Sequence, residues 1–428
     1  MKHIIKYFAA SLTAALFLAG FSSCDRIDYP DRFVQADGTP TINFVREADN
    51  DIAITQASLE QVICIVGENL KSVHDIYFND QQAILNTSFM TENTILVAVP
   101  KNLPQVTTDK MYLITKDSTV VDYDFKVLLP SPKVSSMSFE WAEPGQKVTI
   151  TGNYFAEPLT VEFPGAEATE ISNVTIGSFD VVVPEGAQPG KIKVTTASGT
   201  AQSVFQYKDG RGMLFNFDNA RLNHGWHSQT IQSDENSLDG NYLQLYDAAT
   251  VFKCDGTDWN DTGYHFEYWP GNWNTPETYE DPDGIDLTKV VDFTNFSNMA
   301  IKFEMRIPAD HPWTGCPMQI YFSSLAMCTL GSANNTYFHD ETISLPRVLY
   351  RPWQATGSFD TGGEWITVSF PIDTEFVWDW GGTKASGVLS ADSFAGMEIF
   401  FAAGSSAGEG TPCTPMIQID NIRAVPYK

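Results

Sequence analysis

The chain has 428 residues, of which 43% are hydrophobic, and its 26 basic and 53 acidic side chains give a formal net charge of −27 at pH 7. This length allows two to four domains. So acidic a surface repels phosphate backbones and anionic lipid headgroups, which excludes nucleic acid as a partner. Neutral partners such as uncharged glycans remain open.

The first 23 residues have the pattern of a secretory signal peptide. A basic start with Lys2 and Lys6 precedes the run AASLTAALFLAGF, which is shorter than the roughly 20 apolar residues that a membrane span needs. The run ends on GFSSC, which resembles the lipoprotein box of bacteria, in which the cysteine becomes the lipidated first residue. We predict a signal peptide over 1–23, a lipid anchor on Cys24 and a flexible linker over 24–37. Ordinary secretion with an unmodified cysteine is the alternative.

Residues 38–208 contain one pattern twice. In each copy an alternating apolar strand runs into a glycine, Gly67 in the first and Gly152 in the second. Period-two patterning with frequent turn signals predicts small β-sandwiches. The glycines open the sequences GENL and GNYF, which resemble an element of IPT/TIG immunoglobulin-like domains. The resemblance implies that the glycine makes a tight turn and that the following apolar residue fills the sandwich. We assign these domains to 38–129 and 130–208, and we interpret both as a rigid stalk.

The composition changes after KDGRG, because residues 213–428 hold nine of the ten tryptophans. Segments such as MAIKFEMRI, MQIYFS and MEIFFAA keep a β pattern, and none reads as a long amphipathic helix. Such strands, separated by long loops, predict a jelly-roll-like sandwich over 209–428. Its opening FNFDN and closing IQIDNIRAV resemble the first and last strands of carbohydrate-binding jelly rolls, which lie side by side. The expected fold class is therefore all-β, with two Ig-like sandwiches followed by a larger C-terminal sandwich.

Most tryptophans of this last region stand beside Pro, Gly, Asp or Asn, in segments with no apolar period that could bury them. Exposing a large ring to water is unfavourable unless a partner covers it. The apolar face of a β-linked hexose can lie flat on an indole, while amides, carboxylates and Arg bond its hydroxyls. We therefore predict a glycan-binding platform made of Tyr268, Trp269, Trp273, Trp259, Trp313, Tyr350, Trp353 and Trp378, with Asn272 and Arg351 beside the rings.

No catalytic motif accompanies this platform. The sequence has no HExxH, GxSxG or P-loop pattern and no zinc-type cysteine spacing, so no catalytic residue is assigned. Acid content cannot identify the carboxyl pair of a glycosidase among 53 acidic residues. A lipidated endo-glycanase is therefore the first alternative, and a protein-binding surface adhesin is the second. No cofactor is expected, although analogy with carbohydrate-binding jelly rolls suggests a structural calcium ion at Asp218 and Asp420. A Cys316–Cys328 bridge also stays open.

The whole arrangement resembles the B-type surface glycan-binding proteins of bacterial polysaccharide-utilisation systems, best represented by xyloglucan binders. Cys24, the GENL/GNYF repeat and the FNFDN and DNIRAV ends carry the resemblance. It implies a non-catalytic lipoprotein on the outer face of the outer membrane, beside a SusC/SusD-type transporter pair. Its partner would be a neutral plant polysaccharide, a β-glucan or a hemicellulose such as xyloglucan or mixed-linkage glucan. We expect a monomer.

Overall fold

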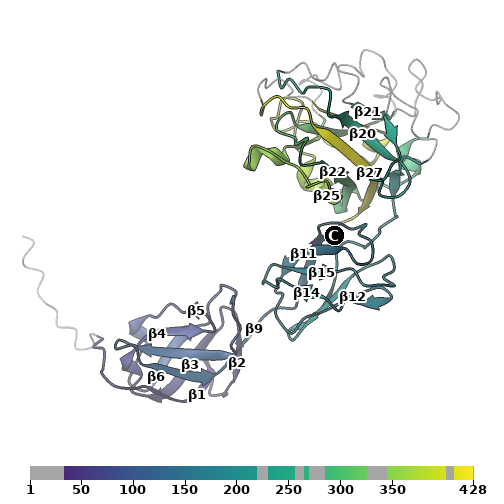
Figure 1. Ribbon diagram of the computed structural model, residues 1–428. Coiled ribbons are helices and arrows are strands. Elements are labelled where there is room, and N and C mark those ends of the chain that lie inside the picture. The colour runs from purple at the N-terminus through teal and green to yellow at the C-terminus, as the bar shows by residue number, and fades with distance from the viewer. Residues whose placement is uncertain are drawn as a thin grey trace, which may run out of the picture. The chain divides into compact units, whose positions relative to one another are not determined.

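The structure is a computed structural model, and it describes residues 33–218, 230–255, 265–268, 285–324, 345–401 and 409–427. These residues form β-strands with few helical turns, which confirms the all-β prediction (Figure 1). The chain divides into two compact units, residues 1–129 and 130–428. Among the described residues, no helix has both the length and the apolar character that a membrane crossing requires. The predicted signal peptide and Cys24 lie outside these residues.

The first unit is a sandwich of two main sheets. One sheet has the order β1 (Thr41–Glu47), β3 (Val62–Glu68), β6 (Thr94–Ala98), and the other has the order β5 (Gln81–Gln82), β4 (Val73–Phe78), β7 (Lys110–Thr115), β8 (Val120–Asp124). β2 (Gln56–Ser58) and β9 (Lys126–Leu128) form a short parallel pair. Alternate residues of the strands, such as Ile65 and Leu113, are fully buried in one core.

The second unit begins with a sandwich of the same kind. One sheet has the order β10 (Lys133–Met137), β11 (Lys147–Asn153), β15 (Ser178–Val182), β14 (Ile171–Ser172), and the other has the order β13 (Ala166–Glu167), β12 (Thr160–Phe163), β16 (Lys193–Thr196), β17 (Gly199–Gln202). Ile150, Phe179 and Val194 are fully buried between the sheets. This is the core that the period-two pattern of the sequence predicts.

The repeated glycine allows two strands to approach closely. A Cβ on Gly67 would lie 1.9 Å from the carbonyl oxygen of Thr41, and a Cβ on Gly152 would lie 1.8 Å from that of Lys133. Both glycines stand inside a strand, opposite a point where the register of the neighbouring strand shifts. Only a residue without a side chain fits there, so the glycine is needed for strand pairing.

The turn that follows is made two residues after each glycine. Asn69 and Tyr154 adopt left-handed conformations, with φ values of 53° and 63°. The expectation that the glycine itself makes the turn is therefore wrong. The next residues, Leu70 and Phe155, are buried, which confirms that the apolar residue after the turn fills the sandwich.

The larger sandwich of the second unit also has two sheets. The first has the order β19 (Ile231–Gln232), β20 (Tyr242–Asp247), β27 (Met416–Pro426), β22 (Met299–Arg306), β25 (Ile366–Pro371), and β18 (Met213–Phe215) also pairs with β27. The second has the order β21 (His265–Tyr268), β26 (Gly396–Phe401), β23 (Met318–Ser323), β24 (Val348–Tyr350). Phe215 lies opposite Ile422, which confirms that the opening and closing strands are neighbours.

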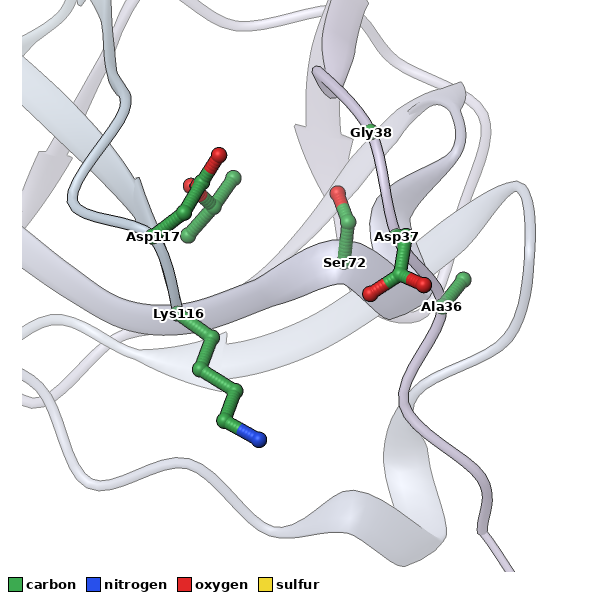
Figure 2. A pocket seen from close by; sticks show the side chains of 7 residues that line it. Ala36, Asp37, Gly38, Ser72, Lys116 and Asp117 are labelled. Carbon is green, nitrogen blue, oxygen red and sulfur yellow. The ribbon is translucent and has the colours of Figure 1, made fainter.

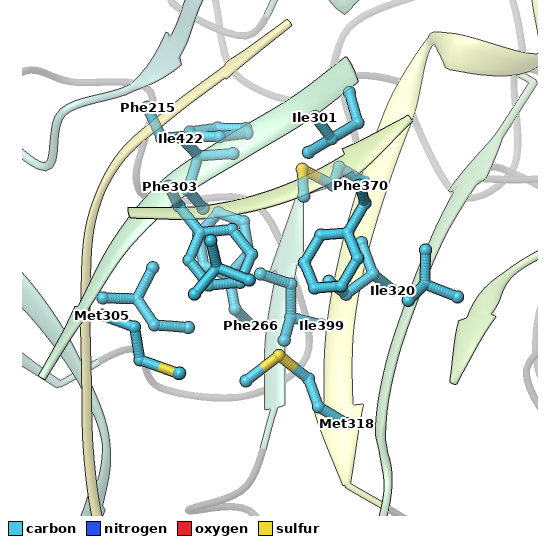
Figure 3. Packing of buried hydrophobic residues seen from close by; sticks show 14 of the residues in the cluster. Phe215, Phe266, Ile301, Phe303, Met305, Met318, Ile320, Phe370, Ile399 and Ile422 are labelled. Carbon is cyan, nitrogen blue, oxygen red and sulfur yellow. The ribbon is translucent and has the colours of Figure 1, made fainter. Parts of the chain in front are cut away.

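These two sheets enclose a single hydrophobic core (Figure 3). Phe303 and Phe370 come from the first sheet, and Ile320 and Ile399 come from the second. Every residue of β23 and β26 is buried, so these strands are covered on both faces. The side chains of these strands that point away from the core are therefore also packed. They determine the chemistry of the outer face of the sheet.

The outer face of the six-stranded sheet carries ion pairs to the preceding sandwich. Glu140, between β10 and β11, accepts from Lys302 Nζ at 2.5 Å and from Arg423 Nη2 at 3.0 Å. Arg423 also donates to the two carboxylate oxygens of Glu304, at 2.6 and 3.0 Å. None of the four side chains belongs to a residue more than 5% exposed. Removing charges from water is costly unless each is paired, so this network requires both sandwiches to be in place.

Backbone and ring contacts extend the same junction. The Glu140 N–H donates to Thr367 Oγ1 at 2.7 Å, and the Thr367 N–H donates to the carbonyl oxygen of Ser138 at 2.9 Å. The guanidinium of Arg423 lies 6.0 Å from the ring centre of Trp141. The second Ig-like sandwich is therefore joined to the larger sandwich by charged, polar and aromatic contacts, a closer union than a simple spacer needs.

We expect Glu140→Ala to lower the free energy of unfolding of the second unit by about 3–5 kcal/mol. Lys302 and Arg423 would stay buried after losing the carboxylate of Glu140 as a partner. Urea denaturation of the full chain, monitored by tryptophan fluorescence, measures the decrease in the free energy of unfolding. Glu143→Ala is the control, since the carboxylate of Glu143 pairs with Lys208 at the surface, and its loss should stay below about 1 kcal/mol. Equal losses in the two variants would contradict a stabilising buried network.

Candidate functional site

The outer face of the four-stranded sheet combines polar and aromatic side chains. Strand alternation directs the core residues to one side and Glu267, Gln319, Tyr321, Glu398 and Phe400 to the other. Strand pairing places Glu398 opposite both Glu267 and Tyr321. Each of these residues is buried, so this side of the sheet brings carboxylates, an amide and aromatic rings together inside the protein.

Arg347 organises these groups at the edge of the sheet. Its Nη1 donates to Gln319 Oε1 at 3.0 Å, and its guanidinium lies 4.9 Å from the ring centre of Tyr321. The ring of Tyr321 meets Phe400 edge-on at 5.9 Å, and Phe400 stacks on Trp380 at 5.7 Å with 17° between the planes. Because the guanidinium is planar and its donors are fixed, these contacts hold rings and donors in one geometry.

Trp378 extends this face to the protein surface. Its backbone N–H and carbonyl bond with those of Arg347 at 3.1 and 2.9 Å, which continues the sheet beyond β24. Directly opposite residues of an antiparallel pair project to the same side, so the ring of Trp378 lies on the side of the Arg347 side chain. Trp378 is 37% exposed, more than any other tryptophan of the described residues.

Among the residues of this face that the structure describes, Trp378 is the one that reaches solvent. The polar residues Glu267, Gln319, Arg347 and Glu398 of the face are at most 3% exposed and have interactions within the protein. Trp378 adds an exposed apolar plane at the rim, which can stack on the apolar side of a sugar ring. We name these residues, with Tyr321, Phe400 and Trp380, the polar–aromatic face.

Two predicted platform residues belong to the core instead. Trp313 is fully buried, and its Nε1 donates to the carbonyl oxygens of Gly315 and Cys316 at 2.7 and 3.0 Å. Tyr268 is also fully buried, and its hydroxyl donates to the carbonyl oxygen of Ile285 at 2.7 Å. The prediction that these rings form a wet platform is wrong, because each ring packs inward and its polar atom is bonded inside the protein.

Trp353 and Tyr350 also pack against the core. Trp353 is 7% exposed, and Tyr350 is half-buried beside Trp313 at 5.8 Å. Burial raises the pKa of Tyr350 above its ordinary value. Their neighbouring Pro, Arg and Gln residues indicate an exposed loop, but Tyr350 ends β24, Trp353 lies in the helical turn that follows, and both rings pack against the core. This is a second correction to the predicted platform.

Arg351 lies in an ion pair, and the remaining predicted contacts cannot be placed. Its Nε and Nη2 donate to the two carboxylate oxygens of Glu409 at 2.5 and 2.8 Å, which fixes its position beside β24. Four further predicted contacts lie outside the described residues and stay predictions: Trp259, Trp269, Asn272 and Trp273. Cys328 lies outside them too, so the Cys316–Cys328 bridge is also untested.

The suggested calcium residues belong to the other sheet. Asp420 lies on β27, and Asp218 follows β18. Burial raises the pKa of Asp420 to about 9, and the negative charges of Asp239, Glu304 and Asp218 add to the rise. In the part of the chain that the structure describes, no three His, Cys, Asp or Glu side chains are grouped as a ready metal site.

A separate polar depression of about 480 Å³ lies on the first unit (Figure 2). Figure 2 shows Asp37 and Ser72 on one side of it and Lys116 and Asp117 on the other. Ala36, Gly38 and Thr115 complete the lining, so the depression has no aromatic ring. It therefore lacks the apolar plane that sugar stacking needs.

Sequence reasoning missed most of the polar–aromatic face. MQIYFS and MEIFFAA were interpreted as core strands, although Gln319 and Glu398 interrupt their apolar runs. A polar residue inside such a run was the available signal, since it indicates that one side of the strand faces something other than the core. Arg347 carried no local signal, because only the folded sheet brings it to Gln319.

Two family models match the chain. Residues 207–426 match the model described as the surface glycan-binding protein B xyloglucan binding domain. Residues 132–208 match the IPT/TIG domain model. The first match covers the larger sandwich that carries the polar–aromatic face.

The chain is also similar to individual proteins and solved structures. The crystal structure of surface glycan-binding protein PbSGBP-B from Prevotella bryantii is 39% identical, with a TM-score of 0.76, and the match covers 92% of this chain and 100% of that chain. SGBP-B from a complex xyloglucan utilization locus in Bacteroides uniformis is 14% identical, with a TM-score of 0.43, over 91% of this chain and 100% of that chain. An IPT/TIG domain-containing protein from Bacteroides ovatus is 29% identical over 202 residues, which are 42% of this chain and 40% of that protein. The chain thus matches less than half of the length of this last relative.

The different burial of two tryptophans predicts different effects on folding. Trp313→Ala should lower the free energy of unfolding by about 3–5 kcal/mol, because it leaves a cavity in the core. Trp378→Ala should change it by about 0.5 kcal/mol or less, as is usual at exposed positions. Thermal unfolding monitored by circular dichroism compares the stability of the two variants. A large loss for Trp378→Ala would show that its ring is a folding element.

Proposed function

Because the chain belongs to the family of B-type surface glycan-binding proteins, we propose that it is an outer-membrane surface lipoprotein that captures a neutral plant polysaccharide. Trp378, at the rim of the polar–aromatic face of its larger sandwich, would stack against the polymer. The Ig-like sandwiches would carry this face away from the membrane, with Cys24 as the lipid anchor. Capture would support import through a SusC/SusD-type transporter pair in the same membrane.

The observation that carries this proposal is the exposed ring of Trp378 at the rim of a face rich in fixed polar groups. A β-linked glucan presents an apolar side to an indole, and its equatorial hydroxyls then point toward neighbouring donors and acceptors. Two backbone hydrogen bonds with Arg347 fix the segment that carries Trp378, so little conformational entropy is lost when a ligand stacks on its ring. The family match to a xyloglucan-binding domain supports a β-glucan or hemicellulose as the ligand.

The charge of the chain supports a neutral polymer. With a net charge of −27, the protein repels polyanionic polysaccharides at long range and leaves uncharged chains unaffected. Xyloglucan and mixed-linkage glucan are both uncharged β-glucans. Either would fit this condition, and we infer that one of them is the natural ligand. We further infer that the protein acts as a monomer.

Its family relatives are non-catalytic binders, so the protein is not an enzyme and the endo-glycanase alternative is set aside. Glu267 and Glu398 are buried side chains of the sheet, and no residue is assigned a catalytic role. Incubation with xyloglucan, barley β-glucan and mannan checks this conclusion, because no reducing ends should accumulate. The surface-adhesin alternative gains support only if none of these polysaccharides retards the protein in an affinity gel.

Trp378→Ala should weaken the binding of xyloglucan or mixed-linkage glucan by about 1–3 kcal/mol, by analogy with other stacked aromatic contacts. Isothermal titration calorimetry with the folded variant measures the loss. Phe44→Ala is the control, because Phe44 is a similarly exposed ring, 39%, in the first unit, and its loss should leave the affinity unchanged. Parental affinity in Trp378→Ala would remove this ring from the site. We expect the same loss from Trp269→Ala or Trp273→Ala.

Cys24→Ala should release the protein from the membrane, because the variant lacks the cysteine that carries the lipid anchor. Fractionation of cells that express the variant, followed by immunodetection, locates the protein. Ser22→Ala keeps a small residue before the cysteine and should leave membrane attachment intact. If Cys24→Ala remained in the membrane fraction, the anchor would have to lie elsewhere.

A further inference from the structure

Trp378 has a cross-strand neighbour on each side. Arg347 lies on one side, where the two backbones exchange hydrogen bonds of 3.1 and 2.9 Å. Lys384 lies on the other side, as the residue directly opposite Trp378 in a short antiparallel hairpin over 377–385. Directly opposite residues of an antiparallel pair project to the same side. The side chains of Arg347, Trp378 and Lys384 therefore share one side of the sheet.

The pairing of Trp378 with Lys384 is of the close type. Two backbone hydrogen bonds flank the pair, at 2.8 and 2.9 Å: from the Asp379 N–H to the Thr383 carbonyl oxygen, and from the Ala385 N–H to the Val377 carbonyl oxygen. The pair lies between these two bonds, which makes it a non-hydrogen-bonded pair. In such pairs the Cα atoms are about 4.5 Å apart and the side chains approach more closely than in hydrogen-bonded pairs. The side chain of Lys384 thus begins directly beside the indole.

A buried carboxylate holds the turn of this hairpin. Asp379 is buried, and its Oδ1 accepts from the Thr383 N–H at 2.8 Å while its Oδ2 accepts from the Thr383 hydroxyl at 2.5 Å. Gly382 has a φ of +82°, and a Cβ there would lie 3.3 Å from Arg351 Nη2. The turn therefore packs against a guanidinium that Glu409 already fixes. Trp378 and Lys384 are thus presented by a firmly held piece of backbone.

Lys384 differs from the other cations near this ring because its ammonium has no partner among the described residues. Arg347 bonds to Gln319, and Arg351 pairs with Glu409. Lys384 is exposed, and its side chain forms neither a hydrogen bond nor an ion pair with any residue that the structure describes. Acidic residues outnumber basic ones by 53 to 26 in this chain, so a shortage of acids does not explain the unpaired ammonium.

An exposed indole with an ammonium beside it provides two complementary contacts for a sugar. The apolar side of a hexose covers the indole, and its equatorial hydroxyls then point outward from the edge of the ring. A lysine ammonium carries three N–H donors on a flexible stem, so it can follow a hydroxyl oxygen near the indole. A hydrogen bond from a charged donor is stronger than one between two neutral groups.

We propose that Lys384 is a further glycan-binding residue, which donates to hydroxyl oxygens of the sugar unit that stacks on Trp378. This inference rests on the proposed function, because it requires that the ring of Trp378 contacts the glycan. Stacking on an indole tolerates many sugars, since it uses only an apolar side. The contact from Lys384 depends on where the oxygen atoms of that sugar lie, and it therefore adds specificity to the stacking contact.

Isothermal titration calorimetry with xyloglucan and with mixed-linkage glucan tests this contact. Lys384→Met keeps an unbranched apolar stem and removes the three donors, so it should weaken binding about three- to tenfold, as expected for one lost hydrogen bond. Lys384→Arg keeps a charged donor and should recover part of this loss. Parental affinity of Lys384→Met for both glucans would overturn the inference.

Lys289→Met is the matched control, because Lys289 is an exposed lysine of the same sandwich on another element. Its affinity for both glucans should equal that of the parent. Thermal unfolding of Lys384→Met and Lys289→Met should give the parental Tm, since exposed substitutions rarely change stability. A loss of affinity as large in Lys289→Met as in Lys384→Met would show a general effect of charge, and would overturn the assignment to Lys384.

Trp378→Ala, measured beside these variants, separates this inference from the proposed function. If Trp378→Ala weakens binding and Lys384→Met does not, the proposed function stands and this inference fails. If neither variant weakens binding of a glucan that the parent binds, the site lies elsewhere and both fail. In the double variant the loss should be smaller than the sum of the two single losses, because both residues hold one sugar unit. Fully additive losses would contradict this shared contact.

Discussion

The buried ion pairs around Glu140 constrain the second unit more than any other interaction. Lys302 and Arg423 cannot stay inside the protein without carboxylate partners, and one partner comes from the preceding Ig-like sandwich. The outer face of the six-stranded sheet is thereby committed to holding two sandwiches together. On the other sheet, the ring of Trp378 at the rim of the outer face is exposed and could stack on a sugar ring.

The two outer faces illustrate two ways of burying polar groups in one sandwich. Around Glu140 and Arg423, full charges neutralise one another and fix the arrangement of two domains. Around Gln319 and Arg347, a single cation is held by an amide and a ring, and carboxylates lie nearby. These groups are buried and interact within the protein. At the surface, the strongly acidic chain would repel an anionic ligand.

The tryptophans show how little a local sequence says about the exposure of a ring. Trp313 and Trp378 both stand beside turn-forming residues, yet the first is fully buried and the second is 37% exposed. The difference arises because Trp313 turns its indole toward carbonyl groups inside the sandwich, whereas Trp378 continues a sheet edge with its ring on the outer side. Of the five predicted rings that the structure describes, Trp378 alone is exposed, and Tyr268, Trp313, Tyr350 and Trp353 pack against the core.

The sequence by itself determined the all-β class, the pairing of the FNFDN and IQIDNIRAV strands, and the burial of Leu70 and Phe155 inside their sandwiches. These features depend on periodicity and on short segments, which the order of residues records directly. Only the tertiary structure decided that Glu140 meets Arg423, that Arg347 meets Gln319, and which indoles reach water. Alternation in a strand indicates that it has two different faces. It cannot indicate which distant element covers each face, because that depends on contacts between residues far apart in the chain.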